Sequence, residues 1–208
     1  MQYRTIRAAA SAEFVEKRSR FIGYISPVTT QQDAIAFIDS IKSKHWDATH
    51  NVPAYIIRNG NICRFSDDGE PQGTAGHPML HVLQMRKLTN VLAVVTRYFG
   101  GIKLGAGGLT RAYSGALSDA VKAAPIVTYT PYARYTVTLP YTAVGGFENY
   151  IKDKDIRVLD RAFTAEVQVT FLTLPEEAKT HLKFLTDLTG GKAVIEEDGE
   201  EYVKVRVW

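Results

Sequence analysis

The segment from Val91 to Ala123 constrains the fold more than any other part of the chain. It begins with VLAVVTRYF at 91–99, a nearly continuous apolar run that predicts a strand buried on both faces. Five glycines follow within nine residues, in GGIKLGAGG at 100–108. Apolar side chains then recur at helical spacing over 109–123. The sequence therefore predicts a strand, a glycine-rich loop and an amphipathic helix in direct succession.

The rest of the first part alternates between strand and helix patterns. Thr30 is placed to cap a helix, and Thr74 is placed to cap a second, shorter one. The dipeptide Asn59-Gly60 favours a type I′ turn and so predicts a β-hairpin. Cys63 lies within a strand pattern and is expected in the core. The predicted strands are 20–26, 52–57 and 62–65, the predicted helices are 31–44 and 77–87, and the polar segment 66–76 is predicted to be a loop.

The second part has the pattern of a separate domain. Pro125 ends the preceding helix, and a linker follows it. The order of predicted elements is β-α-β-β-α-β, which matches the ferredoxin-like plan, with the last strand folded into a hairpin across Asp198-Gly199. The fold class expected is α+β, with domains over 1–125 and 131–208. The predicted elements of the second domain are strands 132–139, 156–162, 165–172, 194–196 and 202–207 and helices 143–152 and 175–189.

Charge is unevenly distributed over the 208 residues. The first 125 residues hold 15 Lys and Arg against nine Asp and Glu, a net charge of +6, and the remaining residues hold 10 against 13, a net charge of −3. Attraction to nucleic acid is therefore expected mainly from the first part. The single cysteine fits a reducing compartment, and no apolar run is long enough for a signal peptide or a membrane span. A cytoplasmic protein without membrane contact is expected.

The glycine loop is the strongest candidate site. Glycines allow a ligand to approach the backbone closely, and the start of the following helix exposes N–H groups with a partial positive charge. The candidate phosphate-binding or nucleic-acid-binding residues are Arg97, Gly100, Gly101, Lys103, Gly105, Gly107, Gly108 and Arg111. The alternative is a tight structural turn that permits close packing of helix on sheet. The spacing matches neither GxGxxG nor GxxxxGK[ST], so a dinucleotide or Walker-type site is not expected.

A second candidate is the acidic loop with its neighbouring histidines, which comprises Asp67, Asp68, Glu70, His50 and His77. These residues could form an acid–base or metal site, or the carboxylates could bind local backbone in an acidic turn. They could also neutralise Arg97 or Arg111. No pair has a metal-ligand spacing, so no catalytic residue, metal or cofactor is assigned. Aromatic residues near the glycine loop, such as Phe99, and others such as Trp46, could stack on bases or simply pack.

Two stretches resemble a known family. SDDGEPQGTAGHPML at 66–80 and VVTRYFGGIKLGAGGLTRAY at 94–113 are similar to the signature of the IMPACT/YigZ family, and the resemblance extends over the whole chain. His77 departs from the pattern, because a basic residue is more frequent there. The resemblance implies a left-handed βαβ N-terminal domain, like that of a small-subunit ribosomal protein and of domain IV of elongation factor G. It implies a ferredoxin-like C-terminal domain like the last domain of that factor.

The resemblance implies that eukaryotic relatives regulate translation through an additional N-terminal domain, which is not expected in this chain. Two functions are therefore expected from the sequence and the resemblance together. The first is a non-enzymatic protein that binds RNA or the ribosome through phosphate groups and modulates translation. The second is an enzyme that acts on a phosphorylated small molecule or nucleotide, with residues 67–70 as base or metal site. A protein partner is also possible for the acidic C-terminal domain.

Overall fold

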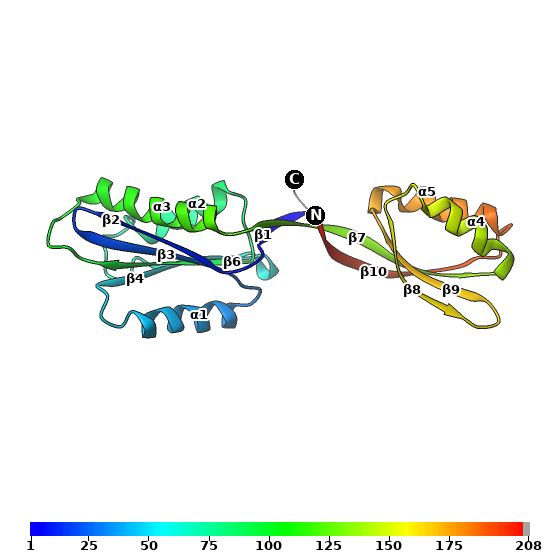
Figure 1. Ribbon diagram of the computed structural model, residues 1–208, viewed down its shortest axis with the longest axis horizontal. Helices are drawn as coiled ribbons and strands as arrows, with labels where there is room; N and C mark the ends of the chain where they lie inside the picture. Colours follow the sequence, from blue (N-terminus) through cyan, green and yellow to red (C-terminus); the bar gives the residue numbers. More distant parts are fainter. Residues whose placement is uncertain (206–208) are drawn as a thin grey trace. The chain divides into compact units, whose positions relative to one another are not determined.

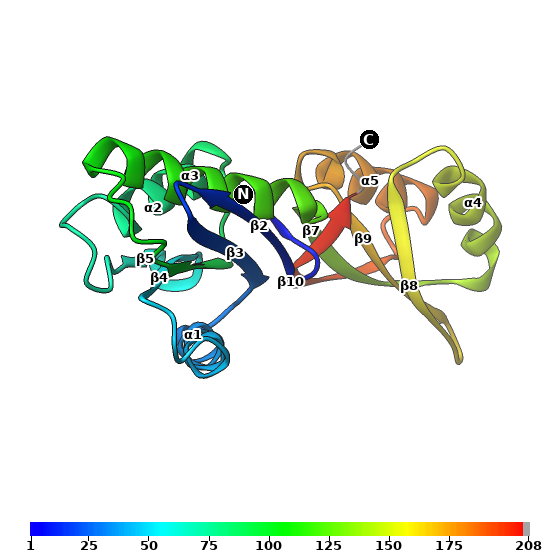
Figure 2. The same ribbon diagram turned by 60° about the vertical axis from the view of Figure 1, so that its left-hand side comes forward.

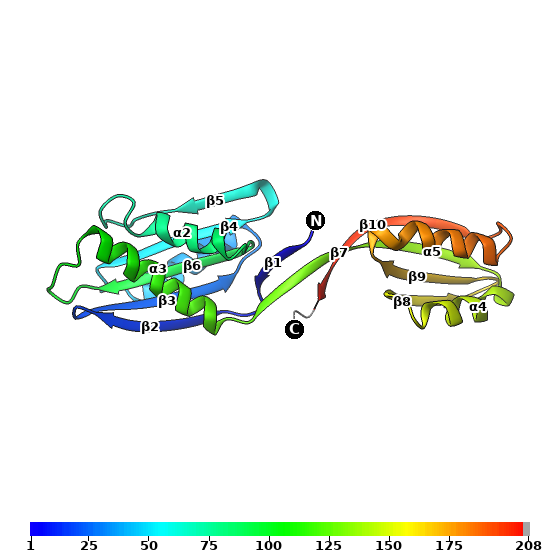
Figure 3. The same cartoon turned by 90° about the horizontal axis from the view of Figure 1, so that it is seen from above.

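The structure, a computed structural model, describes residues 1–205 and divides into two compact units. The N-terminal unit comprises 3–128, and the C-terminal unit comprises 129–205 together with Met1–Gln2. Figures 1, 2 and 3 show the elements of both units. The α+β class expected from the sequence is confirmed. The expected C-terminal domain ran to residue 208, and its last three residues lie outside the described range.

The N-terminal unit is a sheet with helices on both faces. Its strands lie in the order β2(Ala10–Glu16), β3(Ser19–Pro27), β6(Val91–Tyr98), β4(His50–Ile57) and β5(Ile62–Phe65). Both β3 and β4 are antiparallel to β6 and hence parallel to each other, so α1(Gln31–Lys44) is the crossover of a βαβ unit. Helix α1 covers one face, and α2(Gly76–Met85) and α3(Ala106–Ala123) cover the other (Figure 1). Strand β6 is central, which confirms its predicted burial on both faces.

Helix α1 has the bounds that its sequence predicts. Thr30 has extended backbone angles, and its Oγ1 accepts a hydrogen bond of 3.1 Å from the amide of Asp33. That side chain satisfies one of the N–H groups that lack partners at a helix start. Lys42 and Lys44 lie in the last turn, where cations interact favourably with the helix dipole. The signals for this helix are thus local.

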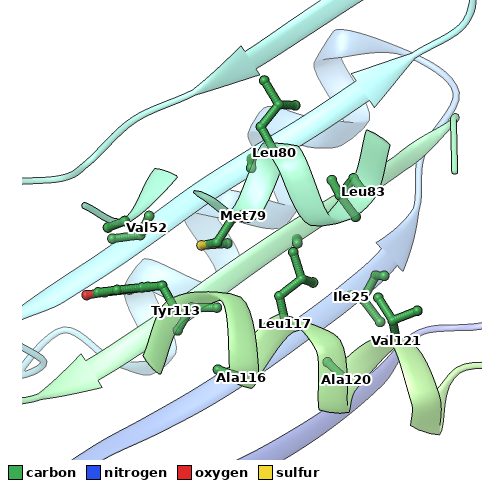
Figure 4. Close-up of a cluster of buried hydrophobic side chains, with 14 of the residues drawn as sticks. Ile25, Val52, Met79, Leu80, Leu83, Tyr113, Ala116, Leu117, Ala120 and Val121 are labelled. Carbon is green, nitrogen blue, oxygen red and sulfur yellow. The ribbon is translucent and has the colours of Figure 1, made fainter. Parts of the chain in front are cut away.

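The main core of this unit lies between the sheet and helices α2 and α3. Figure 4 shows Met79 and Leu83 of α2 beside Leu117 and Tyr113 of α3, all buried. Close approach of α3 to β3 depends on Gly23, because a Cβ there would lie 2.4 Å from the backbone oxygen of Ala116. The hydroxyl of Tyr113 points out of this apolar cluster (Figure 4).

Several local predictions for this unit are wrong. Strand β2 and β1(Tyr3–Ile6) were not predicted. The turn at Asn59-Gly60 is not type I′, because positive φ angles occur at Gly60 and Asn61 and not at Asn59. Cys63 is exposed rather than in the core, because β5 is an edge strand. Thr74 does not cap α2, since its hydroxyl donates to the carbonyl of Pro71 instead.

The C-terminal unit is ferredoxin-like. Its sheet has the strand order β10-β7-β9-β8. Strand β7 begins within the N-terminal unit, and strand β1 also pairs with β7. Helices α4 and α5 lie on the same face of this sheet (Figure 1). The last strand is continuous through Gly199, so the predicted hairpin is wrong. The elements are β7(Ile126–Leu139), α4(Tyr141–Ile151), β8(Ile156–Phe163), β9(Val167–Thr173), α5(Pro175–Leu188) and β10(Val194–Val205). Over the described residues, no helix has both the length and the apolar character needed to cross a membrane.

Candidate anion-binding site

The first turn of α3 presents backbone N–H groups without partners. Helix α3 begins at Ala106, three residues earlier than the sequence indicated, and its first helical bond runs from the amide of Leu109 to the carbonyl of Gly105 at 2.9 Å. Within the described part of the chain, the amides of Ala106, Gly107 and Gly108 have no hydrogen-bond partner. No side chain caps this end and no acidic residue lies in its first turn. The N-terminus of α3 is therefore a partly positive group of donors, in which Ala106 and Gly107 are exposed and Gly108 is half-buried.

Three of the five loop glycines have a clear structural reason. Gly100 donates its amide to Ser19 Oγ at 3.2 Å, and a Cβ at this position would lie 2.0 Å from the backbone of Arg18. Gly101 and Gly105 have φ angles of 84° and 73°, in the left-handed region that favours glycine. The predicted alternative, a structural turn, thus accounts for these three positions.

Gly107 has no such reason. Its φ is not in the left-handed region, and a Cβ placed on it would meet no other group within 4 Å. Gly108, next along the helix, would bring a Cβ within 2.9 Å of the Cβ of Leu104. Glycine is among the poorest helix formers, so packing and backbone geometry do not explain Gly107. An unshielded backbone at this position instead leaves the N-terminal amides accessible to a ligand.

A pocket of about 410 Å³ lies beside this helix end, and we refer to it as the α3 pocket. Its wall is partly apolar and partly polar. The apolar side chains are Pro71, Phe99, Leu104 and Leu109, and the polar ones are Thr49, His50, Glu70, Arg97 and Lys103, with the backbone of Gly105 and Ala106 completing it. Such a volume lies within the range that holds small-molecule ligands. The tertiary structure therefore brings parts of both predicted sites into one pocket.

Arg97 does not offer phosphate the bidentate fork that its position suggested. Its Nη1 donates to Glu70 Oε1 at 2.6 Å, and its Nη2 donates to Ser19 Oγ at 3.4 Å. The side chains of Arg97 and Glu70 are only 6% and 3% exposed, and a buried guanidinium needs such a partner. The Nε of Arg97 has no partner among the described residues. The Nε–H of Arg97, a residue that lines the pocket, is therefore an unused donor.

Glu70 is the centre of a buried network. Its Oε1 also accepts a hydrogen bond of 2.8 Å from the Tyr113 hydroxyl, and burial together with this carboxylate raises the pKa of Tyr113 far above its ordinary value. His50 Nε2 lies 3.6 Å from the same oxygen. His50 Nδ1 lies 2.7 Å from the carbonyl oxygen of Asp68, which can only accept, so Nδ1 carries a hydrogen. When the ring is neutral, its Nε2 is therefore an acceptor.

The two remaining carboxylates of the loop bind backbone. Asp67 accepts hydrogen bonds of 2.8, 3.2 and 2.8 Å from the amides of Gly73, Ala75 and Gly76, at the start of α2. Asp68 accepts a bond of 2.7 Å from the amide of Asn51. Neither Asp67 nor Asp68 lines the α3 pocket, so the three predicted carboxylates do not converge there.

His77 is also separate from the α3 pocket. It is exposed, and its ring lies against Phe65 with a centroid distance of 5.7 Å. Across residues 1–205, no group of three or more His, Cys, Asp or Glu side chains is arranged to hold a metal ion.

The two exposed cations of the loop and helix lie in different places. Lys103 lines the α3 pocket. Arg111 instead lines a neighbouring groove of about 370 Å³ with Lys17, Gly108 and Gly115. The predicted cluster of three cations is thus separated into one buried, ion-paired guanidinium and two exposed charges on adjacent surfaces.

Sequence reasoning missed two groups that organise this site. Ser19 holds both Arg97 and Gly100, although it is about 80 residues away in the chain. Tyr113 belongs to the apolar stripe of α3, so its helical spacing indicated only a core position. Neither residue has a local signal, because the partners of both come from other elements.

Comparison with known proteins places these features in a family. The family model described as Impact N-terminal domain matches residues 17–121, and one described as Domain of unknown function (DUF1949) matches residues 137–192. The IMPACT family member YvyE of Bacillus subtilis (strain 168) is 42% identical over 208 residues, which cover 99% of this chain and 95% of that protein. The IMPACT family member YigZ of Escherichia coli (strain K12) is 37% identical over 164 residues, which cover 76% of this chain and 80% of that one.

A solved structure has the same fold over most of the chain. A crystal structure described as that of a hypothetical protein matches with a TM-score of 0.61 and 30% sequence identity, covering 93% of this chain and 96% of the other. The matching family models and relatives extend over both units. On sequence and structure together, the chain belongs to the IMPACT family.

Proposed function

We propose that this protein binds RNA, free or in the ribosome, by holding phosphate groups at the N-terminus of α3, and that it modulates translation without catalysing a reaction. The observation that carries the proposal is the set of three unpartnered amides at Ala106, Gly107 and Gly108, with the cation Lys103 in the pocket that Ala106 also lines. Backbone N–H groups at a helix start, supported by a lysine, are a general solution for phosphate binding.

The charge of the two units supports this assignment. The first 125 residues have a net charge of +6, and Arg111 and Lys17 provide further exposed cations along α3. The remaining residues have a net charge of −3, so in this proposal the C-terminal unit contacts a protein rather than RNA. The translational role comes from the resemblance to the eukaryotic regulators, and it implies that the protein works in the cytoplasm.

The enzymatic alternative has less support. It requires the carboxylates of residues 67–70 to act as base or metal ligands, and the oxygens of Asp67 and Asp68 accept hydrogen bonds from backbone amides. Only Glu70 lines the pocket, and its Oε1 is engaged by Arg97 and Tyr113. An enzyme of this kind would gain thermal stability from Mg²⁺ together with nucleotide, which a melting screen measures.

The decisive variant is Gly107→Asp. A carboxylate in the first turn of a helix interacts favourably with the dipole, and a side chain at this position meets no other group, so the fold is expected to keep or gain stability. The same carboxylate repels phosphate from the free amides. We expect an affinity for labelled single-stranded RNA lowered by about tenfold or more, since charge-assisted hydrogen bonds are lost.

Two matched controls separate repulsion of phosphate by the introduced carboxylate from the loss of the glycine itself and from the change in net charge. Gly107→Ala tests the loss of glycine without added charge and is expected to bind RNA less tightly than the original protein but more tightly than Gly107→Asp. Gly145→Asp adds the same charge on α4, at an exposed glycine whose Cβ also meets nothing within 4 Å, and is expected to leave RNA affinity unchanged. Melting temperatures of all three variants confirm that the fold is intact.

Salt dependence gives a second, independent measurement. Ribosome co-sedimentation and RNA anisotropy at two salt concentrations are expected to show binding that weakens steeply with salt. Lys103→Ala is expected to reduce the slope by about 0.7, as for one phosphate contact on a single strand. Salt-insensitive binding, or RNA affinity of Gly107→Asp equal to that of Gly145→Asp, would contradict the proposal.

A further inference from the structure

The α3 pocket has an unsatisfied donor in its wall. The Nε of Arg97 is buried and has no partner among the described residues, although Arg97 lines the pocket. Buried donors in proteins are almost always bonded, so an orphaned one marks a place where a further acceptor belongs. Nη1 donates to Glu70 and Nη2 donates to Ser19, so Nε is the nitrogen of this guanidinium that has no partner within residues 1–205. This observation is independent of the free amides of α3.

The same pocket has an exposed aromatic ring. Phe99 is 47% exposed, and it lines the pocket together with Leu104 and Leu109. Phe99 immediately follows β6, and its amide donates to Thr49 Oγ1 at 3.0 Å, so the backbone that carries the ring is held in place. Aromatic side chains held in this way form stacking surfaces for planar groups, nucleobases in particular. The pocket thus combines an anion site with an apolar, aromatic wall.

We propose that the α3 pocket binds a nucleoside 5′-monophosphate group, either as a free mononucleotide or as the 5′-phosphorylated terminal nucleotide of an RNA. The phosphomonoester accepts hydrogen bonds from the Ala106 amide at the start of α3 and from Lys103, and the base stacks on Phe99. The inference rests on the proposed function, because both use the same phosphate site. It goes further by naming the terminal nucleotide as the group that is recognised.

The pocket suits a terminal phosphate better than an internal one. Arg97 and Glu70 line it and are nearly inaccessible, at 6% and 3% exposure, so a group must enter the pocket to reach them. An internal phosphodiester is linked on both sides and follows the surface, whereas a terminal phosphate projects from its nucleotide. A phosphomonoester also has a charge of about −1.5 to −2 at pH 7, which increases its attraction to Lys103 and the helix end. The carboxylate of Glu70 is countered by its ion pair with Arg97.

The polar side chains of the pocket also fit a nucleotide. With its hydrogen on Nδ1, the His50 ring offers Nε2 as an acceptor when the ring is neutral. A ribose hydroxyl is a donor of the right kind for this atom. The pocket therefore provides amide and ammonium donors for the phosphate, an acceptor for the sugar and a ring for the base.

The test compares two RNAs of one sequence that differ only in a 5′-phosphate or 5′-hydroxyl end, with the full-length protein. We expect the 5′-phosphorylated RNA to bind at least about tenfold more tightly, since the loss of charge-assisted hydrogen bonds is of this size. Adenosine 5′-monophosphate is expected to displace it, whereas adenosine is not. Inorganic phosphate is expected to bind more weakly than the nucleotide, because it lacks the base.

Two variants link the binding to the aromatic wall. Phe99→Ala is expected to lower the affinity for adenosine 5′-monophosphate by about fivefold or more while leaving inorganic phosphate binding unchanged. Trp46→Ala is the matched control, because Trp46 is an aromatic residue of the same unit that is 83% exposed and does not line the pocket. It is expected to leave both affinities unchanged.

The outcomes separate this inference from the proposed function. Equal affinity for the two RNAs, with salt-dependent binding retained, overturns the terminal-nucleotide inference and leaves RNA binding intact. Binding of adenosine 5′-monophosphate without any RNA binding at low salt supports the nucleotide pocket and overturns the proposed function. If neither the mononucleotide nor the phosphorylated RNA binds, both proposals are wrong.

Discussion

Arg97 and Glu70 form a nearly inaccessible ion pair, with 2.6 Å between Nη1 and Oε1, beside the pocket at the start of α3. The two residues come from a central strand and from a polar loop, 27 positions apart in the chain. The hydroxyl of Tyr113 on α3 donates to the same Oε1 of Glu70. The pair therefore connects strand β6, the loop at 66–75 and helix α3, the three elements that shape the candidate site.

Removing one charge of this pair is expected to destabilise the protein. Glu70→Gln leaves the buried guanidinium of Arg97 without a counter-charge, and the free energy of unfolding is expected to fall by about 3 kcal/mol. The double variant Glu70→Gln, Arg97→Met removes the uncompensated charge and is expected to regain part of that loss. Urea unfolding of the three proteins measures both effects. A Glu70→Gln protein as stable as the original would show that the pair has no structural importance.

Substitution of two loop glycines by alanine is expected to have opposite effects. Gly100→Ala places a Cβ 2.0 Å from the backbone of Arg18 and is expected to cost about 1–3 kcal/mol of stability, as for overpacked sites. Gly107→Ala meets no obstacle and is expected to leave stability unchanged or to raise it by up to about 1 kcal/mol, because alanine is the better helix former. Thermal unfolding compares them, and equal losses at both positions would contradict the assignment of Gly107 to ligand access.

The capping function of Asp67 is testable by its removal. Asp67→Ala leaves the amides of Gly73, Ala75 and Gly76 without their acceptor, and we expect a loss of about 1–2 kcal/mol, the usual effect of deleting a helix cap. Asp39→Ala, at an exposed position on α1, is the control and is expected to change stability little. Chemical unfolding measures both. Stabilisation of the original protein by Mg²⁺ that is absent from Asp67→Ala would point to a metal site instead.

His45 makes stability depend on pH. Burial, and then Lys44 and Arg20, lower the pKa of His45, whose ring nitrogens lie 2.7 and 2.8 Å from the hydroxyls of Tyr24 and Tyr98. Below about pH 6.5 the unfolded chain binds a proton at this residue that the folded protein resists. The contribution of His45 to stability is therefore complete above that pH and is lost as the pH falls. His45→Gln is expected to give a shallower decline of unfolding free energy between pH 7 and 5, and an unchanged slope would contradict this cause.

The elements that the sequence predicted well are those with local signals. Helix α1 has its bounds as predicted because Thr30 caps it and its apolar residues repeat at helical spacing. Strand β6 was predicted as buried because an apolar run of that length needs cover on both faces. Strands β1 and β2 have no comparable signal. The two residues of the β2–β3 turn, Lys17 and Arg18, have positive φ angles without being glycine or asparagine, so turn chemistry did not indicate that hairpin.

In the candidate site, too, the features with local sequence signals were predicted and those that depend on distant residues were not. The glycine loop, Lys103 and the helix that follows are contiguous, and the sequence alone predicted the helix start as an anion site. The sequence did not show which glycines the fold requires. That depends on how close each position lies to other chain segments: a Cβ at Gly100 would clash with the backbone of Arg18, whereas a Cβ at Gly107 would meet no other group.

The amino-acid sequence by itself determined the order of the helices, the burial of β6 and the presence of free donors where the glycine loop meets α3, because these depend on residues within one or two turns of each other. Only the tertiary structure decided that Arg97 is committed to Glu70, that Asp67 caps α2 and that His50 and Phe99 share a pocket with Lys103. Those pairings join residues far apart in the chain. Burial and hydrogen-bond geometry select such partners only when the sheet and its helices are assembled.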